Sequence, residues 1–160
     1  MVSSLNIDTT QAKIFLNLIP DYPDRLNVLN GHLIIEEVVT EILLINVKDC
    51  KSFIEARLSF SQKTKLLKAY HFEEFSAWLW EGLRLINKLR NNLSHELEPN
   101  DLDVSSSEYV YQYLSTQLRK ELKVGLSENK LIVSIKVISI ELLSYLEKNH
   151  KNHKLINKKI

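Results

Sequence analysis

Apolar residues recur at helical spacing along most of the chain. The longest such pattern runs from about Asp24 to Asn46, just after Pro23, which suits the first turn of a helix. Its predicted buried positions are Leu26, Leu29, Leu33, Val38 and residues 42–45. Similar patterns predict helices over residues 8–19, 61–69, about 74–97, 105–122 and about 128–149. The chain is therefore predicted to be an all-α bundle of about five to six helices.

Two local signals refine this prediction. Ser59 and Gln62 have the spacing of a capping box, which would open the helix over residues 61–69, with Leu66, Leu67 and Tyr70 pointing inward. Gly31 lies inside the long second helix, where glycine costs stability relative to alanine. Its presence there favours close packing of another helix against it.

Residues 131–140 are ambiguous, because they are rich in β-branched side chains and could form a strand. However, no glycine or proline follows that would turn the chain into a partner strand, and an isolated strand is unstable. We therefore predict a buried helix for this stretch.

Composition narrows the class of protein. The chain has 160 residues, 21 Lys+Arg against 20 Asp+Glu, and only 3 Gly and 3 Pro, which is too little turn chemistry for an all-β sandwich. The net charge of +1 argues against a wholly basic surface that coats nucleic acid, although a local basic patch stays possible. We expect one domain over residues 1–150, followed by a basic tail over 151–160 that is either a solvated terminus or a phosphate-binding arm.

The chain offers little sign of export, membrane insertion or metal binding. Cys50 is the single cysteine, so neither an intrachain disulfide nor a multi-cysteine zinc site is expected. The first residues lack the charged and apolar regions of a secretory signal, and the most apolar stretch, Leu33 to Val47, is too short and too charged to span a bilayer. We expect a cytoplasmic protein without a cofactor or metal.

One charged residue interrupts the predicted fourth helix. On a helical wheel Leu79, Leu83, Ile86, Leu89, Leu93 and Leu97 share one face, and Arg84, Lys88, Asn91 and His95 lie nearly opposite. Arg90 falls within about 40° of the centre of the apolar face. A buried guanidinium needs a partner, so Arg90 either pairs with a carboxylate, borders a site, or extends its stem outward to solvent.

The residue types around Arg90 suit metal-independent RNA cleavage. Arginine grips phosphate in a bidentate fork, histidine passes protons near neutral pH, and asparagine offers both a donor and an acceptor. RNA supplies its own nucleophile, the 2′-hydroxyl. On an ideal helix Arg90 and His95 lie about 140° apart, so a bend near Ser94 or a second copy of the chain would be needed to bring them together. A capped helix end with solvated polar residues is the structural alternative.

The segment Arg90-Asn91-Asn92-Leu93-Ser94-His95 resembles the R-x4-6-H motif of the HEPN superfamily, including the polar residue after the arginine. The stretch from Glu55 to Lys63 is similar to a helix connection in small bacterial HEPN-like proteins related to the mannitol operon repressor family. The similarity covers roughly Asp24 to Pro99. It implies an all-α bundle that dimerises with its motifs facing each other, with Arg90 and His95 catalytic and Asn91 assisting.

These observations lead to one functional expectation and two alternatives. We expect a HEPN-type endoribonuclease with a toxin, defence or RNA-processing role, a homodimer acting on RNA, with any antitoxin or regulatory partner a separate chain. Arg84, Lys88 and Asn87 are the expected RNA-binding residues. The first alternative is a non-enzymatic regulator of the mannitol-repressor type, acting by protein–protein contact or weak nucleic-acid binding. The second is a purely structural helical dimer.

Overall fold

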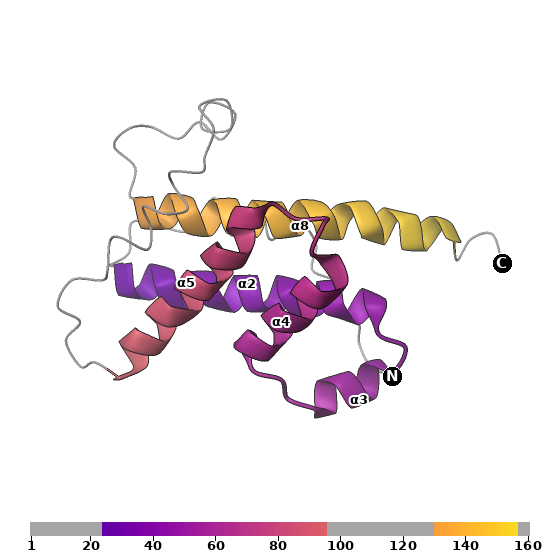
Figure 1. Ribbon diagram of the computed structural model, residues 1–160, viewed down its shortest axis with the longest axis horizontal. Coiled ribbons are helices and arrows are strands. Elements are labelled where there is room, and N and C mark those ends of the chain that lie inside the picture. The colour runs from indigo at the N-terminus through magenta and orange to yellow at the C-terminus, as the bar shows by residue number, and fades with distance from the viewer. Residues whose placement is uncertain (1–23, 96–129, 157–160) are drawn as a thin grey trace, which may run out of the picture.

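The computed structural model describes residues 24–95 and 130–156, and within these ranges the chain is helical with no strand. Five helices are described: α2 (Asp24–Asn46), α3 (Cys50–Glu55), α4 (Phe60–His71), α5 (Ala77–His95) and α8 (Lys130–Ile156) (Figure 1). The predicted all-α bundle is confirmed. The helices predicted over residues 8–19 and 105–122 lie outside the described residues.

Helix α2 is the centre of the bundle, because it packs against α4, α5 and α8. Figure 1 shows α2 and α8 side by side and running in the same direction, with α4 and α5 crossing α2. The shared core contains fully buried residues of both long helices, among them Ile35, Ile42, Ile135 and Leu142. Apolar burial on this scale is the main driving force for packing the helices together.

Residues 131–140 form the first part of α8, as predicted, and not a strand. Nearly all sides of this segment are buried, including Val133, Ser134 and Ile138. A helix that is apolar all round must be buried, which explains why the sequence pattern also fits a strand. The buried hydroxyl of Ser139 donates a hydrogen bond to the carbonyl of Ile135 at 2.8 Å, so its burial leaves no polar group unsatisfied.

Gly31 lies where Ile135 of α8 packs against α2. A Cβ atom added to Gly31 would lie 2.5 Å from Cγ2 of Ile135. The prediction that another helix packs against this glycine is therefore confirmed.

The capping box at the start of α4 is also present. The backbone N–H of Gln62 donates to Ser59 Oγ at 3.4 Å, and the backbone N–H of Ser59 donates to Gln62 Oε1 at 2.9 Å. Helix α4 thus begins one residue before the predicted start and ends two residues after the predicted end. The short helix α3 was not predicted; the Asp49 side chain caps it by accepting from the N–H of Ser52 at 3.1 Å.

Three predicted core positions are wrong. Leu26 and Leu33 are 44% and 64% exposed, because α2 turns Val28, Ile35 and Val39 toward its neighbours instead. Tyr70 is 58% exposed, because Leu67 and His71 occupy the inward positions of α4.

Helix α5 places its leucines as the helical wheel predicts. Leu79, Leu83, Ile86, Leu89 and Leu93 are all buried, whereas Leu97 lies outside the described residues. Helix α8 continues to Ile156, beyond the predicted end at residue 149. It therefore includes the first part of the segment assigned to the basic tail.

Candidate functional site

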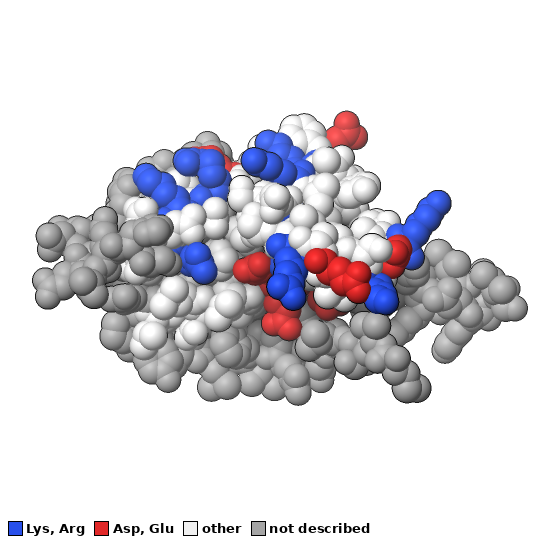
Figure 2. Space-filling model, turned by 90° about the horizontal axis from the view of Figure 1, so that it is seen from below, with Lys and Arg blue, Asp and Glu red and all other residues white. Residues whose placement is uncertain are grey.

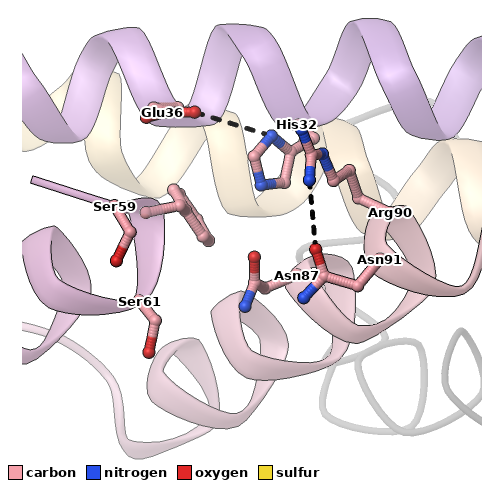
Figure 3. Close-up of a pocket in the computed structure, with 8 residues that line it drawn as sticks. His32, Glu36, Ser59, Ser61, Asn87, Arg90 and Asn91 are labelled. Atoms are coloured by element: carbon pink, nitrogen blue, oxygen red, sulfur yellow. Dashed lines mark hydrogen bonds and ion pairs between the residues drawn. The ribbon is translucent and has the colours of Figure 1, made fainter. Parts of the chain in front are cut away.

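A pocket of about 380 Å³ lies between α2, the start of α4 and the second half of α5 (Figure 3). This volume is within the range of small-ligand pockets. The residues that line it are His32, Glu36, Ser59, Phe60, Ser61, Asn87, Arg90 and Asn91. Most of these side chains carry hydroxyl, amide or charged groups, so the pocket suits a polar ligand.

Helical spacing explains how each element contributes to the pocket. His32 and Glu36 are four residues apart on α2 and share one face. Asn87, Arg90 and Asn91 have the same relation on α5, at i, i+3 and i+4. The N-cap Ser59 brings the first turn of α4 to the same place, and the N-terminus of a helix favours anions.

Arg90 is an exposed residue at this pocket. Its Nη1 donates a hydrogen bond to Oδ1 of Asn91 at 3.2 Å (Figure 3). Arg90 therefore borders a pocket, which is one of the three arrangements that its position on the helical wheel allows. The contact also orients the Asn91 amide beside the guanidinium.

His32 lines the same pocket and is only 4% exposed. Its ring packs against Phe60 with a centroid distance of 4.4 Å. Its Nδ1 lies 3.8 Å from Oε2 of Glu36, and Nε2 is buried and makes no hydrogen bond of ordinary geometry among the described residues. No local pattern in the sequence places this histidine near Arg90.

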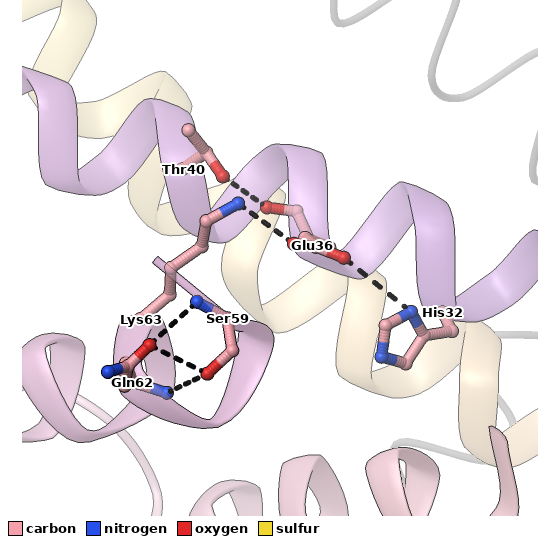
Figure 4. Close-up of polar contacts among 6 residues, drawn as sticks. All are labelled: His32, Glu36, Thr40, Ser59, Gln62 and Lys63. Atoms are coloured by element: carbon pink, nitrogen blue, oxygen red, sulfur yellow. Dashed lines mark hydrogen bonds and ion pairs between the residues drawn. The ribbon is translucent and has the colours of Figure 1, made fainter. Parts of the chain in front are cut away.

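The charge of Glu36 is balanced from the opposite side. Lys63 Nζ on α4 donates to Oε1 of Glu36 at 2.8 Å, and Figure 4 shows Glu36 between Lys63 and His32. Both partners of this ion pair are largely screened from solvent, with side-chain exposures of 16% and 27%. The carboxylate is therefore held in place beside the His32 ring.

Burial lowers the pKa of His32 below its ordinary value of 6.5. Glu36 and Asn87 oppose this shift, while the positive charges of Arg90 and Lys63 add to it. His32 is consequently the neutral imidazole at neutral pH.

The lowered pKa of His32 predicts how the stability of the protein depends on pH. Unfolding exposes His32, so below pH 6.5 the unfolded chain binds a proton that the folded chain does not. Stability should therefore fall as the pH drops below this value, and His32→Gln should remove that part of the fall. Urea unfolding of wild type and variant over a pH series measures the difference, and identical pH slopes would contradict it.

The other predicted site residues are distributed as follows. Helix α5 is continuous through His95, whose side chain lies outside the described residues, so one helix keeps positions 90 and 95 about 140° apart. Of the expected RNA-binding residues, Asn87 lines the pocket. Arg84 and Lys88 are exposed and do not line it, and the Arg84 guanidinium binds Glu81 through Nε at 2.7 Å and through Nη2.

Charged side chains do not form one broad patch on the face drawn in Figure 2. Basic groups are spread over the described part of this face, and most acidic groups lie from its centre toward the right, next to basic ones. The described part of this face therefore carries no single broad basic surface.

The described residues contain no group of three or more His, Cys, Asp or Glu side chains that could hold a metal ion. Within the same residues, no helix has the length and apolar character needed to cross a membrane. Comparison with protein-family models, with curated proteins and with solved structures gives no match to this chain.

Proposed function

We propose that this chain is a metal-independent endoribonuclease of the HEPN type, with Arg90 at the centre of its site. The observation that carries the proposal is the position of Arg90, an exposed arginine that lines a polar pocket together with two asparagines and a buried histidine.

The pocket has the groups that a phosphodiester needs. The Arg90 fork would bind two non-bridging oxygens, and the amides of Asn87 and Asn91 would donate to phosphate or ribose oxygens. Ser59 and Ser61 add hydroxyls at the positive end of α4. The positive charge of the guanidinium lies beside the non-bridging oxygens. It stabilises the transition state, because negative charge builds up on these oxygens there.

His95 would supply proton transfer in the same reaction, as either base or acid. Because α5 is helical through His95, the two motif positions point in different directions, and a second copy of the chain would bring His95 to the Arg90 pocket. The proposal therefore includes a homodimer, RNA as substrate, a cytoplasmic location, and a separate chain as any antitoxin.

Cleavage of RNA by the purified full-length protein in the presence of a chelator tests this function. The expected products are a 2′,3′-cyclic phosphate and a 5′-hydroxyl, because the 2′-hydroxyl is the nucleophile. An RNA of the same sequence with 2′-O-methyl groups should stay intact. Uncut RNA over a range of sequences and pH values would contradict the proposal and favour the non-enzymatic regulator.

A further inference from the structure

His32 is the one buried histidine at the Arg90 pocket, and its two nitrogens differ in their surroundings. Nδ1 faces the Glu36 carboxylate at 3.8 Å, whereas Nε2 is buried and makes no hydrogen bond of ordinary geometry among the described residues, although the nearby Asn87 side chain raises the pKa of His32. A buried polar atom left without a partner costs free energy, so its retention calls for an explanation. Figure 3 shows this ring beside the Arg90 guanidinium and above Asn87.

The neighbouring carboxylate favours one tautomer of His32. A negative charge facing Nδ1 favours the proton on that nitrogen, which leaves the lone pair on Nε2. Lys63 holds Glu36 in place through the 2.8 Å contact, and the ring is held against Phe60. The result is a fixed imidazole whose basic nitrogen belongs to the same pocket as Arg90.

We propose that His32 is the general base of this site, with Nε2 accepting the proton of the RNA 2′-hydroxyl and Glu36 acting as its positioning residue. The inference rests on the proposed function, which it extends by assigning the base to the same subunit as Arg90. It leaves His95 the role of the acid.

The reaction balances without any further reactant. The 2′-oxygen gives its proton to Nε2 and forms a bond to phosphorus, and the bond from phosphorus to O5′ breaks. The electron pair leaves with O5′, which takes a proton from His95. Nε2 is buried in the free protein, so side chains that line the pocket must move before the 2′-hydroxyl can reach it.

The charges around His32 agree with a base and not with a permanent cation. Glu36 on α2 raises its pKa, and Lys63 on α4 and Arg90 on α5 lower it. Burial is the largest influence and lowers the pKa as well, so the ring is neutral and able to accept a proton near neutral pH. A general base works best when its pKa is close to the pH at which the enzyme acts.

Rates of RNA cleavage by His32→Gln and Glu36→Gln variants test the assignment. His32→Gln should lower kcat by about 100-fold or more, the usual range for loss of a general base. Its Kd for a 2′-O-methyl RNA should stay close to that of wild type, because phosphate binding is assigned to Arg90. His71→Gln is the matched control, since His71 is equally buried but lies outside the pocket, and it should keep wild-type kcat.

Glu36→Gln gives a second readout that does not depend on replacing the histidine. Because Glu36 raises the pKa of His32, the low-pH limb of kcat/KM should lie at lower pH in the variant than in wild type. The pH-independent value of kcat/KM should also be lower. A structural role for Glu36 would change stability and leave this limb in place.

The outcomes separate this inference from the proposed function. If wild type cuts RNA, Arg90→Ala does not, and His32→Gln cuts at the wild-type rate, His32 is not the base and the function stands. If His32→Gln loses binding and kcat in parallel, it is a phosphate ligand and the inference fails. If His32→Gln does not fold, the Glu36→Gln variant decides. A low-pH limb of kcat/KM that stays at its wild-type position in this variant overturns the inference. A wild type that cuts no RNA overturns both.

Discussion

Arg90→Ala is expected to lower RNA cleavage by about 100- to 1,000-fold, the usual cost of removing one group that stabilises charge in a transition state. Arg90 is an exposed residue, so the free energy of unfolding should change by less than about 0.5 kcal/mol. Single-turnover cleavage and urea unfolding of the same preparations measure the two effects. A large loss of activity with unchanged stability would place Arg90 in the reaction.

Two further variants show whether charge or geometry matters. Arg90→Lys keeps the charge but loses the planar fork, so it should recover only part of the rate. Lys51→Ala removes one positive charge from α3, where Lys51 is exposed and outside the pocket, and should cut RNA as wild type does. If Arg90→Ala instead unfolds the protein, Arg90 is a structural residue and the candidate site is wrong.

The sequence predicted those features that depend on local periodicity. Helix α2 has the predicted bounds because its apolar pattern and Pro23 mark them, and Ser59 with Gln62 identified the start of α4. The exposed positions of Leu26 and Leu33 were missed because α2 is apolar on more than one side. Which side is buried depends on α8, a helix far along the chain, and no local pattern contains that information.

Only part of the candidate site could be predicted, because contacts between helices are not contained in any local sequence pattern. The helical wheel marked Arg90 as a charge near an apolar face, which depends on α5 alone. The approach of His32 and Glu36 depends on how α2 crosses α5, and the contribution of Ser59 depends on where α4 begins. The spacing of His32 and Glu36 was a usable signal, because a histidine and a carboxylate at i and i+4 share a helix face.

The contact between Gly31 and Ile135 predicts an effect on stability that changes sign with the background. Gly31→Ala alone should destabilise the protein, because its Cβ would lie 2.5 Å from the stiff β-branched side chain of Ile135. Overpacking of this kind costs about 1–3 kcal/mol, more than the 0.5–1 kcal/mol or so that alanine gains over glycine within a helix. Ile135→Ala alone should cost about 2–5 kcal/mol, since Ile135 is fully buried.

In the Ile135→Ala background the obstructing atoms are gone, so Gly31→Ala should become stabilising by about 0.5–1 kcal/mol. Ile138→Ala is the matched control: it removes another fully buried isoleucine of α8, and the three atoms nearest to the added Cβ all belong to Ile135. There Gly31→Ala should cost as much as in wild type. Urea unfolding followed by circular dichroism measures all six proteins. Equal costs of Gly31→Ala in every background would mean that Ile135 does not press against Gly31, and the packing of the two long helices would need to be revised.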